Sequence, residues 1–108
     1  MKSDTPEPDG RPYHVSFHRE VAKIVAQHGV DSELFRPTIG ELITALENHP
    51  KKFEKKRGKL KDTRAAEVQF SDGVAWRAVF LIDEDRRAVR VLALGPHDAA
   101  YADAQRRI

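Results

Sequence analysis

The chain has 108 residues, a formal net charge of +2 and no cysteine. This length fits one domain, whose core can form without a metal or a disulfide. The missing cysteines exclude disulfides and cysteine-based zinc sites, and they are compatible with the cytoplasmic location that we expect. No stretch approaches the roughly 18 apolar residues of a membrane span, so we expect no membrane partner.

The N-terminal residues 1–12 are polar and include the prolines Pro6, Pro8 and Pro12. This composition favours a flexible lead-in rather than a secretory signal. We expect a single domain over residues 13–108. It begins with a β-prone run at 13–17, a predicted first strand. Apolar residues and one histidine then recur on one helical face: Phe17, Val21, Ile24, Val25 and His28. This spacing predicts a helix near residues 18–28 that ends at Gly29.

A second helical face follows directly. Its apolar positions are Phe35, Ile39, Leu42, Ile43 and Leu46. Pro37 suits the first turn of a helix, and the residue before Pro50 is biased away from helical backbone angles. The sequence therefore predicts a second helix near residues 37–48.

The apolar period then changes from 3.6 to 2, which predicts three strands near residues 65–70, 74–82 and 88–94. Asp72-Gly73 is a turn signal between the first two. A short final helix is expected to be capped by Asp98, with Arg106 and Arg107 near its C-terminal end. The predicted class is α+β, with a mostly antiparallel sheet packed on the two N-terminal helices and the element order β-α-α-β-β-β-α.

The predicted strand at 74–82 is apolar on both faces, and Arg77 is its only charged residue. A sheet covered on one side alone should alternate more cleanly between apolar and polar residues. We therefore expect the second face to be covered as well, either by the final helix or by a partner chain.

The positive charge is concentrated in residues 50–64, which carry a net charge of +6. The basic residues of this basic segment are Lys51, Lys52, Lys55, Lys56, Arg57, Lys59, Lys61 and Arg64. Such a density of charge favours binding to the phosphate backbone of a nucleic acid. The alternative is an ordinary solvated loop, the usual fate of a charge run.

The element order and the basic segment before a three-strand meander resemble the RelE/ParE toxin superfamily of type II toxin–antitoxin systems, including its YoeB-like and HigB-like members. The similarity is most specific in the strand Trp76-Arg77-Ala78-Val79-Phe80. It continues through Gly95 and Pro96 to His97, Asp98 and Tyr101. The resemblance implies a toxin that is held inactive by a cognate antitoxin.

Two activities are implied by this family. RelE-like toxins are ribosome-associated endoribonucleases that cleave mRNA, whereas ParE-like toxins inhibit DNA gyrase without an enzymatic reaction of their own. We expect the first activity, with mRNA and the ribosome as partners. The alternatives are gyrase inhibition and a non-toxic domain that only binds a partner.

Four residues are candidates for catalysis, and each also has a structural interpretation. Arg77 resembles the family's central-strand arginine, and a guanidinium there can clamp a phosphate, but it can instead pair with Glu67 across the strands. Glu67 is a candidate general base, although a strand carboxylate is usually solvated or paired. His97 is a candidate acid or base, or else an exposed turn histidine. Tyr101 resembles a family tyrosine that contacts the RNA base, or else it anchors the last helix.

The sequence departs from the archetypal RelE pattern in one respect. Lysines that the archetype carries on a strand are absent where this chain reads Glu67-Val68-Gln69. Lys59 and Lys61 are possible substitutes, and a Glu/Arg/His arrangement as in YoeB-like members is the other option. No metal site or cofactor is expected, because the histidines show no convincing ligand spacing.

Overall fold

The structure is a computed structural model that describes residues 12–31, 35–56, 58–60, 62–69 and 75–108. The expected lead-in, apart from Pro12, and the predicted Asp72-Gly73 turn lie outside these residues. The elements, with η for a short 3₁₀ helix, are β1 (His14–Phe17), α1 (Arg19–Asp31), α2 (Phe35–Asn48), η1 (Pro50–Lys52), β2 (Glu54–Lys55), η2 (Gly58–Leu60), β3 (Arg64–Gln69), β4 (Ala75–Asp83), β5 (Ala88–Pro96) and α3 (His97–Arg107).

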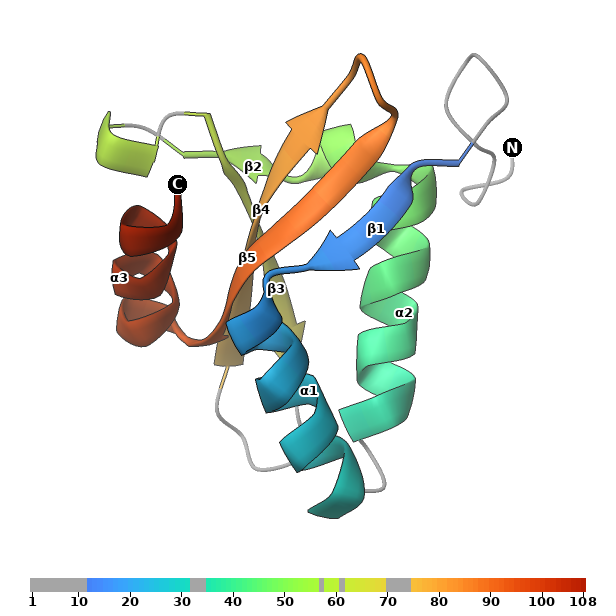
Figure 1. Ribbon diagram of the computed structural model, residues 1–108, viewed down its shortest axis with the longest axis vertical. Helices are drawn as coiled ribbons and strands as arrows, with labels where there is room; N and C mark the ends of the chain where they lie inside the picture. The colour runs from blue at the N-terminus through green and yellow to red at the C-terminus, as the bar shows by residue number, and fades with distance from the viewer. Residues whose placement is uncertain (1–11, 32–34, 57, 61, 70–74) are drawn as a thin grey trace.

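The five strands form one mixed sheet in the order β1-β5-β4-β3-β2 (Figure 1). β1 runs parallel to β5, and every other pair in this sheet is antiparallel. The predicted α+β class and the meander of three consecutive antiparallel strands are confirmed. β2 was not predicted: two residues of the basic segment pair with the start of β3 and so join the sheet as a short edge strand.

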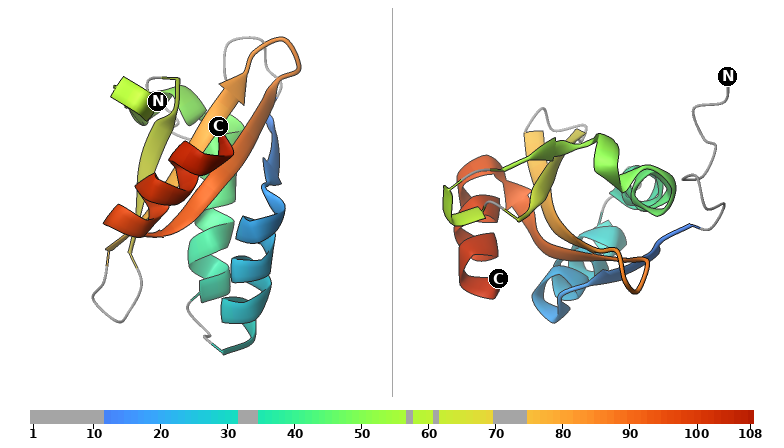
Figure 2. Two further views of the ribbon diagram at one scale, coloured as in Figure 1. Left: turned by 60° about the vertical axis from the view of Figure 1, so that its left-hand side comes forward. Right: turned by 90° about the horizontal axis from the view of Figure 1, so that it is seen from above.

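Helices cover both faces of this sheet, with α1 and α2 on one side and α3 on the other (Figures 1 and 2). The larger core lies between the sheet and the first two helices, and Leu46 and Phe80 are fully buried in it. A smaller core joins α3 to Val79, Ala93 and Leu60. β4 is apolar on both faces because the chain itself covers both. The first two helices pack on one face, and α3 covers part of the other.

A bulge in β5 lets this strand serve both cores. Val79 pairs with Ala93 and Phe80 pairs with Val91, so Leu92 is an extra residue between two regular pairs. Bulges shift the alternation of side chains along a strand, and here Val91 faces the larger core while Ala93 faces α3. The Arg107 Nη1 donates a hydrogen bond to the Leu92 carbonyl at 2.8 Å. The bulge thus also fixes the C-terminal end of α3 against the sheet.

Helix boundaries differ from the predicted ones at three places. α1 does not end at Gly29 but continues to Asp31, and α2 begins at Phe35 with Pro37 in its first turn. The N-cap of α3 is Pro96, and no side-chain hydrogen bond caps this helix, so the predicted cap at Asp98 is wrong. Asp98 is instead the second residue of α3, where its charge is favourable near the positive end of the helix dipole.

The start of α1 is capped by a residue that the sequence did not single out for this role. His18 Nδ1 accepts a hydrogen bond from the Glu20 backbone N–H at 3.1 Å. The His18 N–H in turn donates to the Val91 carbonyl at 2.8 Å, which continues the β1–β5 ladder. One residue therefore ends β1 and begins α1, satisfying an amide that a helix start leaves without an intrahelical partner.

Candidate functional site

Arg77 and Glu67 lie on the α3 side of the sheet. Their neighbours Ala66, Val68 and Ala78 face the larger core, so the alternation of a strand sends Arg77 and Glu67 the opposite way. The two residues are direct partners in the β3–β4 ladder, and Arg77 Nη1 is 3.5 Å from Glu67 Oε2. Nη1 is buried and makes no hydrogen bond among the described residues. The guanidinium therefore has an ion pair but also unused donor capacity.

His97 begins α3 and Tyr101 lies one turn farther along this helix, at the same end of the sheet. Arg77 pairs with Gly95 of β5, and α3 begins two residues beyond that glycine. The two rings are in edge contact, with centroids 4.5 Å apart at an angle of 79°. His97 Nδ1 also lies 3.0 Å from Asp98 Oδ1. This aspartate was missed as a site residue, because its sequence position suggested a helix cap.

Tyr101 serves as an anchor and as part of this surface at once. Its ring is half-buried against the α3 core, as the structural interpretation predicted. The same ring is approached by Lys56, whose Nζ is 4.7 Å from the ring centroid. An ammonium at this distance over a ring makes a cation–π contact. Lys56 thereby brings the basic segment next to Tyr101.

Other basic residues of the segment are engaged elsewhere. Lys51 Nζ lies 2.9 Å from Glu84 Oε2, far along the chain at the β4–β5 turn. Arg64 Nη1 donates to the backbone carbonyls of Lys51 and Phe53 at 3.0 and 2.9 Å, which fixes the path of the segment. Lys52 and Lys55 are exposed. Arg57, Lys61 and the side chain of Lys59 lie outside the described part of the chain.

The arrangement offers the functional groups that phosphodiester cleavage requires. Arg77 supplies a planar guanidinium that can bind a phosphate through two parallel hydrogen bonds. Glu67 and His97 are both exposed and can exchange protons with solvent or with a ligand. The Tyr101 ring offers a surface on which a base can stack. These groups come from β3, β4 and α3, and the fold collects them on one side of the sheet.

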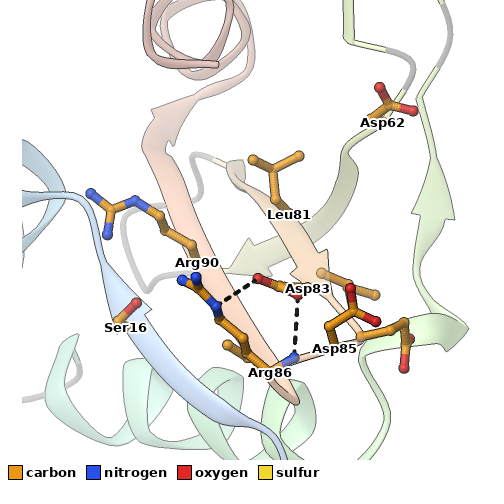
Figure 3. Close-up of a pocket in the computed structure, with 10 residues that line it drawn as sticks. Ser16, Asp62, Leu81, Asp83, Asp85, Arg86 and Arg90 are labelled. Atoms are coloured by element: carbon orange, nitrogen blue, oxygen red, sulfur yellow. Dashed lines mark hydrogen bonds and ion pairs between the residues drawn. The ribbon is translucent and has the colours of Figure 1, made fainter.

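A hollow of about 760 Å³ lies farther along the sheet, beside the β4–β5 turn (Figure 3). It is lined by Ser16, Asp62, Leu81, Ile82, Asp83, Glu84, Asp85, Arg86, Ala88 and Arg90. Carboxylates outnumber arginines there, and Arg86 is already engaged with Asp83. This charge repels a polyanion, so we place the candidate site around Arg77 and Tyr101 rather than in the hollow.

Within the residues that the structure describes, no helix is long and apolar enough to cross a membrane. In that same part of the chain, no group of three His, Asp or Glu side chains is arranged to hold a metal ion.

No protein-family model and no curated protein matches the chain. Among solved structures, it is similar to the Escherichia coli toxin RelE, in a double arginine-to-alanine variant in its free state. The two share 24% sequence identity with a TM-score of 0.66, over 90% of this chain and 98% of the other. The meander, the two N-terminal helices and the helix behind the sheet thus form an architecture already known, and this chain has the RelE toxin fold.

Proposed function

We propose that this protein is the toxin of a type II toxin–antitoxin system and acts as a ribosome-associated endoribonuclease that cleaves mRNA. The observation that carries the proposal is the position of two pairs on one side of a RelE fold. Glu67 and Arg77 face each other on the sheet, and His97 and Tyr101 are in edge-to-face contact at the adjacent end of α3. An mRNA-cleaving site of this kind acts in the cytoplasm.

Each member of these pairs has a role in the proposed reaction. The ribose 2′-oxygen attacks the adjacent phosphorus as the bond from phosphorus to the 5′-oxygen breaks. Glu67 accepts the proton from the 2′-hydroxyl, and His97 delivers one to the leaving 5′-oxygen. Arg77 stabilises the charge that develops on the phosphorane-like transition state. Tyr101 orients the neighbouring base by stacking.

The basic segment supplies affinity rather than chemistry in this scheme. Its exposed members, including Lys52 and Lys55, bind the backbone of mRNA or ribosomal RNA through charge. Arg57, Lys59 and Lys61 are assigned to the same surface from the sequence alone. Lys51 and Arg64 contribute positive charge while they also hold the segment in place.

A cognate antitoxin completes the proposal as the binding partner. The part of the second sheet face that α3 leaves open includes Leu81, which is only half-buried. An antitoxin segment that covers this face and the basic segment would block access to RNA. Co-expression with a small protein encoded beside the toxin should raise the yield of soluble chain and give a stable complex. A free chain that is indifferent to that neighbour counts against this partner.

The activity is tested by adding the purified chain to a cell-free translation extract and mapping mRNA ends by primer extension. Cleavage within translated codons, lost when Arg77→Ala replaces the wild type, supports the proposal. Undisturbed translation together with inhibited DNA supercoiling would instead identify a gyrase inhibitor. If the folded chain affects neither process, it is a partner-binding domain, and the roles of Arg77 and His97 should be abandoned.

A further inference from the structure

Gly95 lies within β5, directly beside Arg77. The two residues are partners in the β4–β5 ladder, and Glu67 is the partner of Arg77 on its other side. Ala93 faces α3 and Leu94 faces the larger core, so the alternation of the strand turns Gly95 toward α3 again. Glu67, Arg77 and Gly95 therefore form one row across three strands, on the face that carries the candidate site.

The fold itself gives no reason for a glycine at this position. Glycine weakens a strand, because its backbone loses more freedom on folding and it has no side chain to pack. Left-handed backbone would require it, but the φ of Gly95 is not positive, unlike that of Gly58. The bulge of β5 lies three residues earlier, at Leu92, and the pairing of Gly95 with Arg77 is regular. Neither of these usual causes applies to Gly95.

A side chain at position 95 would also meet no obstacle. Apart from its two neighbours in the chain, no atom of the described residues lies within 4 Å of a Cβ placed on Gly95. The glycine itself is buried, so its backbone is covered while the space beyond it is open. The Arg77 guanidinium reaches the other way, to within 3.5 Å of Glu67. A strand glycine without a local cause often marks a place where a ligand approaches the backbone closely.

We propose that the missing side chain of Gly95 makes room for the scissile phosphate of RNA, and this inference rests on the proposed endoribonuclease function. The phosphate lies against the bare backbone of β5, and its non-bridging oxygens reach Arg77 from the side opposite Glu67. A guanidinium has five N–H donors, so Arg77 can bind the phosphate on one side and keep Glu67 on the other. His97 begins α3 two residues beyond Gly95, next to the same phosphate.

Gly95 thereby acts as a positioning residue for the cleavage reaction. A methyl or isopropyl group at this position would occupy the place of a phosphate oxygen and hold the phosphate away from Arg77. Cleavage requires the reacting atoms to be aligned closely, and a displacement of about 1 Å can cost about 10²-fold in rate. The size of the side chain at position 95 should therefore control the rate of cleavage, although no group of this residue takes part in proton transfer.

The test compares Gly95→Ala and Gly95→Val with Gly40→Ala. Gly40 is a matched control, because a Cβ there also meets nothing within 4 Å, but it lies on α2, across the sheet from α3 (Figure 2). Single-turnover cleavage of ribosome-bound mRNA gives the rate constant at saturation. We expect Gly95→Val to lower it by about 10²-fold and Gly95→Ala to lower it less. Gly40→Ala should cleave like the wild type.

A double variant shows whether the valine acts through Arg77. In the Arg77→Ala background, Gly95→Val should slow cleavage little further, because the contact that it disturbs is already absent. If the two effects instead multiply in full, position 95 acts independently of the bound phosphate, and the proposal is overturned.

Thermal unfolding followed by circular dichroism separates this role from a structural one. Both glycine-to-alanine variants should melt at the wild-type temperature or above it, because alanine loses less backbone freedom on folding. A loss of stability in Gly95→Ala but not in Gly40→Ala would assign the glycine to the fold and overturn the proposal. A folded Gly95→Val that cleaves at the wild-type rate would also overturn it, with the endoribonuclease intact. A wild-type chain that cleaves no mRNA would refute the proposed function itself, and the inference with it.

Discussion

Arg77 and Glu67 occupy opposite positions in the β3–β4 ladder, and their charged atoms are 3.5 Å apart. Each of the two residues had both a structural and a functional interpretation in the sequence. The observed ion pair fits the structural one, but it leaves Arg77 Nη1 without a hydrogen bond among the described residues. The ion pair therefore holds the guanidinium on this face of the sheet and leaves one of its buried nitrogens without a hydrogen-bond acceptor in the described part of the chain.

Replacement of this guanidinium should separate the two roles. We expect Arg77→Ala to slow mRNA cleavage by about 10²–10³-fold per folded molecule, because one contact that stabilises transition-state charge is lost. Arg90→Ala, on an exposed arginine of β5, is the control for removal of the same charge. If Arg77→Ala lowers the free energy of unfolding but cleaves at the wild-type rate, the residue is only a cross-strand partner of Glu67.

His97 should give the cleavage reaction a pH dependence. We expect His97→Gln to remove one limb of the profile of the cleavage rate against pH and to slow the reaction by about 10²–10⁴-fold, the usual contribution of general acid–base catalysis. Binding to non-cleavable mRNA should remain. Asp98→Asn, which changes the partner 3.0 Å from His97 Nδ1, should slow cleavage less than His97→Gln does, because the imidazole itself remains. A profile of unchanged shape in His97→Gln would exclude the proposed proton transfer.

His18 should couple folding to pH through its cap on α1. Burial, then the nearby Arg107 and Arg90, hold the pKa of His18 below its ordinary value. A depressed histidine pKa in the folded state means that the unfolded state binds more protons as pH falls. The contribution of neutral His18 to the free energy of unfolding is complete above the unfolded pKa of about 6.5. It is lost as pH falls through the folded value.

A non-titrating cap tests this assignment. Asn is among the best N-cap residues, so His18→Asn should keep the helix start and flatten the dependence of unfolding free energy on pH between pH 7.5 and 5. His14→Asn, at an exposed histidine of β1, is the control and should retain the wild-type slope. Urea denaturation followed by circular dichroism measures both. The same slope in wild type and His18→Asn would show that the cap does not depend on protonation.

Tyr13 and Glu84 join the first strand to the β4–β5 turn. The Tyr13 hydroxyl donates to the Glu84 carboxylate at 3.1 Å, and Tyr13 is 2% exposed. We expect Tyr13→Phe to lower the free energy of unfolding by about 0.5–1.5 kcal/mol, the usual net value of one hydrogen bond. Chemical denaturation at pH 7 measures it, and a Tyr13→Phe variant as stable as the wild type would contradict the assignment.

The ionised Glu84 carboxylate should stabilise the fold at neutral pH and not at acidic pH. The hydrogen bond from Lys51 lowers the pKa of Glu84 below its ordinary value, with burial opposing it. The carboxylate therefore stabilises the fold above the unfolded pKa of about 4.3, and this contribution disappears as pH falls through the folded value. Glu84→Gln should destabilise the chain at pH 7 and have little effect at pH 3. Because this side chain is about half exposed, the effect belongs at the low end for an ion pair.

The sequence by itself determined the local elements and the chemical character of the site. Apolar spacing of 3.6 and then 2 predicted two helices and a three-strand meander, because each period leaves one face to bury. The apolar residues on both sides of β4 predicted that the second face of the sheet is covered as well. The residues around Arg77 carried the resemblance to the RelE/ParE family. Predictions failed mainly at helix boundaries: α1 continues past Gly29 to Asp31, and α3 begins at His97, before the expected cap Asp98.

Only the tertiary structure decided which distant residues meet. The parallel pairing of β1 with β5 and the edge strand β2 depend on strand register, which no local spacing records. The bulge at Leu92 reverses the alternation of β5 and, through Arg107, sets where α3 lies. Whether Lys56 or Lys55 lies beside Tyr101 follows from that same register, because a shift of one residue exchanges the two faces of a strand. Of the eight basic residues the sequence singled out Lys59 and Lys61, whereas the pairing of β2 with β3 places Lys56 beside Tyr101.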